Sequence, residues 1–582
     1  MSASGTDHEV DVVVVGSGAG GLAAAVTAAR RGLKVLVLEK EPLYGGTTAR
    51  SGGVLWVPGH GLGDGSVGGL NGPDSPEAAR RYLEGECGAA FNAEKVNAFL
   101  HHGPRMVDFF TRETEVRFVN LPEFPDYHPD RPGASQGGRS FLAAPFDARL
   151  LGARMKALRP PLKEITFMGM MFNASEEVQH FFKVTRSLRS ALYVTRRLAA
   201  HALEMLRHGR ATRLTNGNAL AARLAKSAFD LGVELWLDAP LVELQSDGER
   251  ITGVVAQRGG QTVRIGARRG VVLAAGGFPH DVQRRQQLFP HAPTGTEHRS
   301  PAPPGNTGDG LRLARAAGAA IDDELPNAAA WIPVSAVPRG KGPAGVFPHL
   351  IDRYKPGIIA VTPRGERFVN EAHSYHDVGQ AMQRAAGPGQ PAVAWLVCDH
   401  RTLRRYGMGF VKPFPLPLLP HLRSGYLLRG RTLQDLARQA GIAPDGLAAT
   451  VTEFNRGAEL GEDPRFGRGS TAYNRYLGDR EHRPNPCVAP ITDGPFYAIR
   501  TTIGDLGTFA GIRTDGAARA LDAHGQPIAG LYAVGNDSTS IMGGNYPGAG
   551  ITLGPALTFG FIAGEQLATS STSPSTGAHH AD

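Results

Sequence analysis

The fold is decided by one stretch near the N-terminus, Val12-Val13-Val14-Val15-Gly16-Ser17-Gly18-Ala19-Gly20-Gly21. Its β-branched apolar run is typical of a strand buried on both faces of a parallel sheet. The glycines allow a tight turn, a close approach of backbone to a pyrophosphate, and close packing of a helix on the strand. That helix, expected over residues 22–31, directs its N-terminal N–H groups and its dipole at the phosphates. The stretch therefore predicts a dinucleotide-binding βαβ unit.

A carboxylate follows where the ribose of such a dinucleotide is bound. A second apolar run, residues 35–38, ends at Glu39, about 20 residues after the glycines, where a carboxylate accepts a hydrogen bond from the ribose hydroxyls. Two glycine-rich, hydroxyl-bearing turns come next and can wrap a tightly held group, a collar that an exchangeable NAD does not need. The residues expected to contact the cofactor here are Lys40, Gly45, Gly46, Thr47, Thr48, Ser51, Gly52 and Gly53.

The far end of the chain is expected to complete the same domain. Residues 543–554 read Gly-Gly-Asn-Tyr-Pro-Gly-Ala-Gly-Ile-Thr-Leu-Gly and lead into an apolar run at 555–563. Tyr546, within this stretch, is expected where the reactive ring of the cofactor lies. The two ends of the chain together indicate a discontinuous Rossmann-like domain.

Composition sets the class of protein and excludes several functions. At 582 residues the chain is too long for one core, and 41% apolar residues with 76 glycines and 42 prolines indicate a loop-rich α/β protein of two domains. Its three cysteines lack CxxC spacing, which excludes a cysteine-based zinc or iron–sulfur site, and no metal-ligand spacing occurs. A polar N-terminus and the lack of an 18-residue apolar run predict a cytoplasmic protein without a signal peptide or a membrane span.

Much of the basic charge lies in one segment. Residues 183–213 hold eight basic residues and one acid, with apolar residues close to helical spacing, and a bulky apolar run that we expect to be exposed precedes them at 167–172. One interpretation is a solvated helix that covers the active site, and the other is an element that lies on an anionic membrane surface. Nucleic-acid binding is least favoured, because no aromatic-interleaved platform or helix-turn-helix pattern accompanies the charge. The basic residues are Lys183, Arg186, Arg189, Arg196, Arg197, Arg207, Arg210 and Arg213.

The collar at residues 45–53 resembles that of flavoproteins in the fumarate reductase and 3-ketosteroid dehydrogenase superfamily, which hold FAD. Residues 271–277 and 306–310 resemble the strand and turn that return to the flavin domain of this family, and residues 530–537 resemble its last cofactor strand. The resemblance covers nearly the whole chain and implies FAD as the cofactor. It adds cofactor contacts at Ala275, Gly276, Gly535, Asn536, Asp537, Gly550, Thr552 and Leu553.

These placements predict an α/β chain with a discontinuous Rossmann-like FAD-binding domain and a second, α+β substrate domain that caps it. A cleft between two such domains is a usual place for a ligand pocket. Residues 356–371 of the substrate domain are expected to form a hairpin. The expected divisions are 1–330 for the first part of the FAD-binding domain with a basic helical insertion at about 150–213, 331–500 for the substrate domain, 501–567 for the rest of the FAD-binding domain, and 568–582 for a disordered tail rich in Ser, Thr, Ala and Gly.

One position separates the branches of this superfamily. Its fumarate-reducing members place a proton-donating arginine four residues after the glutamate of an Arg-Phe-x-Asn-Glu motif, which here is residues 367–371. The corresponding residue is Tyr375. A dicarboxylate would need cationic clamps at this point, whereas a neutral phenol suits an uncharged, apolar substrate. The position therefore favours the ketosteroid dehydrogenase branch, which residues 124–129 and 545–550 also resemble.

The resemblance implies α,β-dehydrogenation of a cyclic ketone, most like that of a 3-ketosteroid Δ1-dehydrogenase. Tyr546 O–H and the backbone N–H of Gly550 resemble the family's carbonyl-binding pair. Tyr375 takes the α proton, with Tyr127 hydrogen-bonded to it, and the β hydride goes to flavin N5. Because an ordinary tyrosine has a pKa of about 10, the pKa of this base must be lowered by its neighbours or the base must act in a relay.

Two alternative substrates stay open from the sequence. One is a smaller cyclic ketone such as cyclohexanone, which needs the same chemistry. The other, disfavoured by Tyr375, is an enoate reduced as fumarate reductase reduces its substrate. In each case electrons pass between the flavin and a separate partner, which for a dehydrogenase is a quinone-like or other acceptor.

Overall fold

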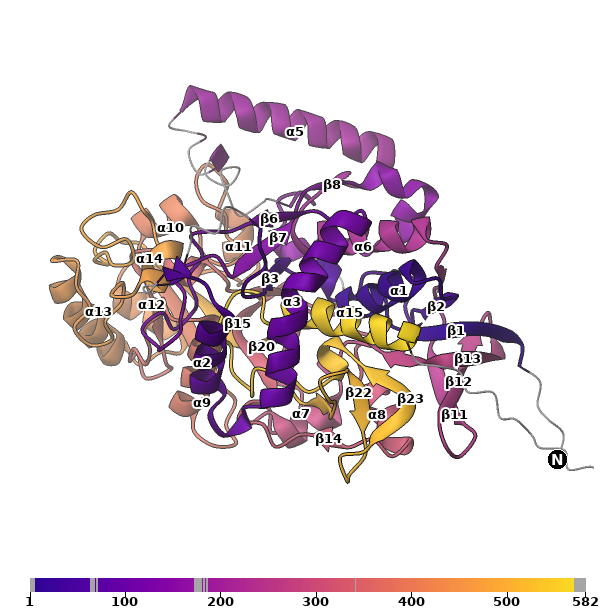
Figure 1. The fold of residues 1–582 in the computed structure, drawn as a ribbon. Helices are drawn as coiled ribbons and strands as arrows, with labels where there is room; N and C mark the ends of the chain where they lie inside the picture. Colours follow the sequence, from indigo (N-terminus) through magenta and orange to yellow (C-terminus); the bar gives the residue numbers. More distant parts are fainter. Residues whose placement is uncertain are drawn as a thin grey trace, which may run out of the picture.

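The computed structural model describes residues 6–62, 68–69, 72–171, 180–181, 184, 187–340 and 342–569, and its two largest sheets organise the chain (Figure 1). The larger sheet has the strand order β10-β2-β1-β13-β12-β11, with β23 also paired to β13 and β22 to β23. Five of its strands form the parallel core: β10 (Glu234–Trp236), β2 (Val35–Leu38), β1 (His8–Val15), β13 (Gln261–Leu273) and β23 (Pro527–Ala533). The others are β11 (Leu241–Ser246), β12 (Ile251–Arg258) and β22 (Arg519–Leu521).

The N-terminal unit forms where its sequence predicts it. Val12, Val13 and Val14 are fully buried in β1, and α1 (Ala19–Arg30) follows the glycine turn. Gly16 has a φ of +107°, and a Cβ there would lie 2.2 Å from the carbonyl oxygen of Ala274. Only glycine fits this position, because any side chain would meet the backbone that follows β13.

The last helix closes the domain that the first strand opens. α15 (Leu553–Thr569) packs against α1, yellow beside indigo in Figure 1. The helices approach closely, because a Cβ on Gly560 would lie 2.4 Å from the carbonyl oxygen of Gly20. The predicted discontinuous Rossmann-like domain is confirmed. Because α15 is helical through Thr569, the disordered tail predicted from residue 568 is wrong at its first two positions, and residues 570–582 lie outside the described residues.

The second sheet is antiparallel, with the order β16-β15-β20-β18-β17 and β19 paired to β20. β15 begins at Ala329 and β20 continues to Thr508, so both strands pass the boundaries expected at 331 and 500. The expected hairpin is reduced to one bridge between Val361 and Arg367. The strands are β15 (Ala329–Val337), β16 (Gly345–Pro348), β17 (Ile358–Val361), β18 (Val393–Cys398), β19 (Leu428–Gly430) and β20 (Phe496–Thr508). The helices of this region are α9 (Tyr375–Ala386), α10 (His400–Tyr406), α11 (Leu419–Arg423), α12 (Leu433–Ala440), α13 (Pro444–Ala458) and α14 (Ala472–Leu477).

A loop that matters for the site connects two strands of a small third sheet, which has the order β3-β7-β6. Arg139, buried near the end of this loop, holds Asp126 at 2.6 Å and Asp74 at 2.8 Å, so the loop is fixed immediately before Tyr127. The sheet and the remaining helices are β3 (Val54–Trp56), β6 (Phe118–Asn120), β7 (Ser140–Ala143), α2 (Pro76–Cys87), α3 (Ala93–Glu113), α6 (Asn216–Asp230), α7 (Val282–Leu288) and α8 (Asp309–Ala316).

The basic segment contains α5 (Leu188–His208), which lies along an outer edge of the molecule in Figure 1. The bulky run before it is not the exposed patch that was expected, because Met170 and Met171 are buried and only Met168 is strongly exposed. Phe172, Lys183 and Arg186 lie outside the described residues. Within the described ranges, no helix is both long enough and apolar enough to cross a bilayer.

Candidate active site

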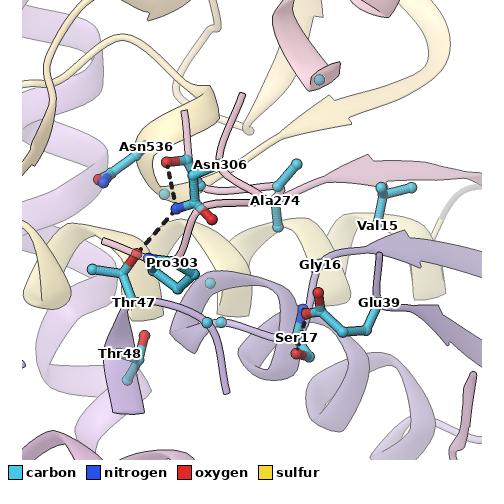
Figure 2. A pocket seen from close by; sticks show the side chains of 18 of the residues that line it. Val15, Gly16, Ser17, Glu39, Thr47, Thr48, Ala274, Pro303, Asn306 and Asn536 are labelled. Atoms are coloured by element: carbon cyan, nitrogen blue, oxygen red, sulfur yellow. Dashed lines mark hydrogen bonds between the residues drawn. The ribbon is translucent and has the colours of Figure 1, made fainter. Parts of the chain in front are cut away.

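A cavity of about 1160 Å³, its open mouth included, lies at the carboxyl ends of four of the five parallel strands (Figure 2). Its walls include the residues that end or follow β1, β2, β13 and β23, namely Val15, Leu38, Ala274 and Val534. In open α/β sheets this edge is where nucleotides bind, because helix N-termini and glycine turns face it. α1 begins here and has no acidic residue in its first turn, which leaves its N-terminus free to attract phosphate.

Most of the predicted cofactor contacts line this cavity. They are Gly16, Ser17, Gly18, Ala19, Gly20, Glu39, Lys40, Gly46, Thr47, Thr48, Ser51, Ala275, Gly276, Gly535, Asn536, Thr552 and Leu553. Six predicted residues do not line it: Gly21, Gly45, Gly52, Gly53, Asp537 and Gly550.

Several of these six support the cavity from behind. A Cβ on Gly21 would lie 2.1 Å from the carbonyl oxygen of Gly16, so this glycine allows α1 to pack on the turn. The buried carboxylate of Asp537 accepts the N–H groups of Ala275 at 2.7 Å and Gly277 at 2.8 Å. It therefore shapes the wall that those residues form. Burial raises the pKa of Asp537 to about 6.

Glu39 faces the start of α1 across the cavity, and Figure 2 shows it beside Ser17. Its carboxylate accepts hydrogen bonds from the hydroxyl and from the N–H of Ser17, the latter at 3.2 Å. Burial raises the pKa of Glu39, and the hydrogen bonds from Ser17 and from the Glu41 N–H act against that rise. The carboxylate is placed where the sequence predicts a ribose partner.

The sequence did not predict a set of side-chain hydrogen bonds among residues that line the cavity. Glu41 accepts the N–H of Gly305 at 2.6 Å and the guanidinium of Arg159 at 2.7 Å. Asn306 donates to Thr47 Oγ1 at 3.0 Å, as Figure 2 shows. All five residues line the cavity. The sequence marks the turn at 306–310 but gives it no role. No local motif points to Arg159, which lies 118 positions from Glu41.

Three buried tyrosines from distant segments meet beside the cofactor cavity. Tyr127 is on the loop between β6 and β7, Tyr375 is the first residue of α9, and Tyr546 precedes α15. The hydroxyls of Tyr127 and Tyr375 are 2.9 Å apart, so the predicted hydrogen bond is present. The ring of Tyr546 lies 4.9 Å from that of Tyr375 and 5.7 Å from that of Tyr127, centroid to centroid. A side-chain hydrogen bond to Thr552 links Tyr546 to the cavity wall.

The tyrosine environment does not lower the pKa of the expected base. Burial, and then the neighbouring phenols Tyr127 and Tyr546, hold the pKa of Tyr375 well above its ordinary value. Burial likewise raises the pKa of Tyr127 and of Tyr546. Of the two routes open from the sequence, this environment favours a hydrogen-bonded relay over a pKa lowered by neighbours.

A continuation of the phenol cluster was also missed from the sequence. The ring of Tyr473 lies 4.4 Å from that of Tyr127, and its hydroxyl lies 2.6 Å from the hydroxyl of Tyr354. The Tyr354 ring in turn lies 5.0 Å from the guanidinium of Arg353, which is fully buried. The phenols thus form a chain that ends on a cation. No motif marks Tyr354 or Tyr473, because only the tertiary fold brings them to Tyr127.

Gly550 lies beside the tyrosines in a conformation that requires glycine. Its φ is +100°, and a Cβ there would lie 2.5 Å from the carbonyl oxygen of Val54. Its carbonyl accepts the N–H groups of Trp56 and Gly554. Within the described part of the chain its N–H meets no acceptor, so this donor is available to a bound ligand.

The sheet, the glycine turns and a phenol cluster beside a nucleotide cavity together define an oxidoreductase that holds a dinucleotide in a discontinuous domain. The chain belongs to the family described as FAD binding domain, whose model matches residues 11–553. It is an FAD-dependent oxidoreductase. The residues present fit FAD, because the cavity is large and joins a helix N-terminus, a buried carboxylate and close glycine backbone in one space.

The chain is similar over almost its full length to characterised dehydrogenases. It is 43% identical to 4-oxocyclohex-2-ene-1-carboxylate 5-dehydrogenase of Sinomonas cyclohexanicum, covering 96% of this chain and 93% of that one. It is 38% identical to 3-oxosteroid 1-dehydrogenase of Mycobacterium tuberculosis, covering 97% and 99%. The crystal structure of 3-ketosteroid Δ1-dehydrogenase from Sterolibacterium denitrificans with 1,4-androstadiene-3,17-dione has a TM-score of 0.88, 38% identity, and coverage of 97% and 100%. The resemblance drawn from the motifs is confirmed.

Proposed function

We propose that this protein removes two hydrogens from the α and β carbons of a cyclic ketone, with a 3-ketosteroid desaturated at Δ1 as the first candidate substrate. The observation that carries this proposal is the 2.9 Å contact between the hydroxyls of Tyr127 and Tyr375, with Tyr546 packed against both. A ketone bound there would meet hydroxyl donors and a proton acceptor among these buried rings. Relatives named as 3-oxosteroid and cyclohexenecarboxylate dehydrogenases support the same chemistry.

In this proposal each residue has one task. The Tyr546 hydroxyl and the Gly550 N–H donate to the ketone oxygen and stabilise the negative charge that develops there, a contribution that typically reaches 10²–10³-fold in rate. Tyr375 accepts the α proton. FAD held by the glycine turns, Glu39 and the N-terminus of α1 would supply the acceptor for the β hydrogen and its electron pair, and a C=C bond would form as the two C–H bonds break. A separate acceptor, for which we propose a quinone-like molecule, finally takes the two electrons.

The relay gives Tyr375 a way to act despite its high pKa. Tyr375 first loses its hydroxyl proton to solvent, and its phenolate oxygen, held by the hydrogen bond that Tyr127 donates, then accepts the α proton. Tyr127 is hydrogen-bonded to Tyr375, and Tyr473 and Tyr354 continue the chain to the buried Arg353. Spreading negative charge over several hydroxyls and toward a guanidinium costs less than placing it on one buried oxygen.

The charged residues of the Arg-Phe-x-Asn-Glu motif argue against a dicarboxylate substrate. Arg367 pairs with Glu371 at 2.7 Å and with Asp463 at 2.8 Å, and Arg468 pairs with Glu371 at 3.2 Å. All four side chains are buried and engaged with one another. They therefore hold the second domain together and offer no clamp to a carboxylate.

A smaller ring ketone is the second candidate, favoured by the 43% identity to a dehydrogenase of 4-oxocyclohex-2-ene-1-carboxylate. Anaerobic mixing of the enzyme with a 3-ketosteroid, 4-oxocyclohexanecarboxylate, cyclohexanone or fumarate separates the candidates. We expect flavin absorbance to bleach with the steroid. Bleaching only with the ring acid would assign the second candidate, and bleaching with no ketone would refute the proposed function.

We also propose that α5 rests on an anionic membrane surface, from which an apolar ketone can reach the enzyme. Leu188, Leu192 and Leu206 are 91%, 73% and 84% exposed, and at 3.6 residues per turn they fall within about 40° of one another around the helix. Three exposed arginines occupy the next flank: Arg189, Arg196 and Arg207. Two other basic residues of the segment are engaged by the protein, since Arg197 lies 3.8 Å from Glu204 and Arg210 donates to backbone carbonyls. An apolar stripe beside a basic flank suits an anionic interface.

A further inference from the structure

One imidazole joins the two segments that carry the hydrogen-bonded tyrosines. His128 follows Tyr127 in the chain, and Asp377 lies two residues after Tyr375 in the first turn of α9. His128 Nε2 is 2.9 Å from Asp377 Oδ2. Its Nδ1 is 2.9 Å from Glu86 Oε1 on α2. The imidazole therefore bridges two carboxylates from elements that are far apart in sequence.

α2 also holds the third tyrosine segment. The Asn545 side chain donates to the backbone carbonyl of Glu86 at 2.7 Å. The hydroxyl of Tyr82, one turn earlier on α2, donates to the carbonyl of Pro547 at 2.7 Å, and that carbonyl also accepts the N–H of Tyr127 at 2.9 Å. Two of the tyrosine-bearing segments, those of Tyr127 and Tyr546, are thus held at the C-terminal end of α2. His128 links that end to α9, which carries Tyr375.

The charge state of this link follows from its partners. Each ring nitrogen faces a carboxylate oxygen, so both must donate and the ring must be an imidazolium. Burial alone would lower the pKa of His128, but the hydrogen bonds to Asp377 and Glu86 raise it to about 10. The same contact holds the pKa of Asp377 well below its usual range despite burial. The bridge is therefore charged at neutral pH.

We propose that His128 is a positioning residue: by bridging Glu86 and Asp377 it aligns the hydroxyl of Tyr127 with that of Tyr375. The inference rests on the proposed function for its kinetic consequence but not for its geometry. Tyr127 lies on the loop between β6 and β7, whereas Tyr375 begins α9, and no backbone hydrogen bond joins these two residues. Without the bridge, the loop of Tyr127 is still held by its N–H on the Pro547 carbonyl, but its alignment with Tyr375 rests on ring packing and the 2.9 Å contact itself. A misplacement of about 1 Å in such a constellation can cost about 10²-fold in rate.

The test uses flavin-loaded holoenzyme and two variants that remove a cation from the same carboxylate. His128→Gln leaves one amide that cannot bridge both acids. Arg131→Gln is the matched control, because Arg131 also contacts Glu86, at 3.0 Å, but is half exposed and does not touch α9. We expect the rate constant of flavin reduction to fall at least about tenfold in His128→Gln while ligand affinity changes by less than about threefold. Arg131→Gln should stay within about twofold of wild type.

A double variant distinguishes positioning from loss of stability. Asp377→Asn cuts the bridge at its other end, so it should slow flavin reduction to a similar extent. Because the two changes break one link, His128→Gln/Asp377→Asn should be no slower than either single variant within about twofold. Multiplying effects would overturn the proposal, as would a normal rate in His128→Gln. If that variant fails to fold, a normal rate in Asp377→Asn refutes the bridge on its own.

A spectroscopic readout keeps this inference separate from the proposed function. In protein labelled with ¹³C at the tyrosine Cζ, the signals of the two residues are assigned by their loss in Tyr127→Phe and Tyr375→Phe. We expect both signals to shift in His128→Gln and in Asp377→Asn, and to stay in place in Arg131→Gln. Unshifted signals in the bridge variants would refute the positioning role even if no ketone is turned over. Shifted signals in an enzyme that no ketone reduces would support the bridge and refute the function.

Discussion

Burial sets what each tyrosine of the cluster can do. A phenol whose pKa is well above the ordinary value, such as that of Tyr375, stays protonated in neutral solution. It can take a proton only after it has lost its own, and the hydrogen bond that Tyr127 donates at 2.9 Å stabilises the phenolate left behind. Tyr546 has a different task, because a raised pKa keeps its hydroxyl protonated and able to donate to a ketone.

Single-atom deletions separate these two tasks. Tyr375→Phe should lower the rate of flavin reduction by about 10²–10⁴-fold, as loss of a general base does, while a dienone product analogue still binds. Tyr546→Phe should lower the rate at least about tenfold and weaken binding of the analogue, because the carbonyl loses a donor. Stopped-flow absorbance and ligand titration measure both. Tyr406→Phe is the control, since that hydroxyl contacts Asp479. A near-normal rate in Tyr375→Phe would move the base to Tyr127, or to Tyr193 on the basic helix α5.

The His128 bridge should also show itself in stability. An imidazole whose pKa rises from about 6.5 in the unfolded chain to about 10 in the fold stabilises fully below the first value and loses its contribution as pH rises through the second. The stability advantage of wild type over His128→Gln should therefore shrink between about pH 7 and 10. Urea unfolding of both proteins across that range measures it.

The groups that face His128 leave this window clear. Asp377 stays ionised because its pKa is lowered, and burial lowers the pKa of His373 and His376, which keeps both neutral. The remaining charges beside it are Glu86 and Arg131. A difference that did not change with pH would mean that His128 is not charged in the fold.

At the scale of elements, α5 differs from the other long helices because its leucines face outward. α3 and α15 bury their apolar residues against each other and against α1, whereas α5 buries only Ser190, Val194 and His201. A helix of this kind gains little from the fold on its exposed side. Its outer face is therefore free to contact a membrane surface.

Liposome co-sedimentation tests whether α5 binds a membrane surface. Wild type should bind vesicles with anionic lipid at low salt and release at about 1 M salt, where the Debye length is about 3 Å. Arg189→Glu/Arg196→Glu/Arg207→Glu should bind far less, since each arginine near the surface contributes about 1 kcal/mol. The control carries the same charge change on exposed Arg112, Arg312 and Arg364 of other elements. Equal sedimentation of both variants would leave α5 as a solvated cover of the site.

At the scale of the whole molecule, FAD joins parts of the chain that are hundreds of residues apart. The cavity takes walls from β1 and α1, from the 303–310 turn, from β23 and from α15. Acid precipitation should release the flavin into a yellow supernatant, because no covalent attachment motif lies in the collar. Free FAD at about 1,000 times its Kd should raise the free energy of unfolding by about 4 kcal/mol. Melting of apoprotein with and without FAD measures this, and equal melting temperatures would contradict it.

The cofactor half of this architecture could be predicted because its signals are local. Gly16, Gly18 and Glu39 act through turns and spacings that a short window of sequence contains. Arg159 and Tyr473 could not be found this way, since each reaches the site only through contacts across more than a hundred residues. Met170 and Met171 show the opposite error: a run of bulky side chains says that burial is favourable, but not whether the fold supplies it.

The packing of α15 against α1 has a consequence for how the protein is made. A ribosome adding 5–20 residues per second needs roughly half a minute or more to reach the end of a chain of this length. For most of that time β1 and α1 are outside the ribosome without α15, the helix that covers them. The nascent N-terminal unit must wait, with apolar surface open to chaperones and to misfolding, until α15 has been made. We therefore expect a transcript cut short before α15 to yield a chain that cannot retain its flavin.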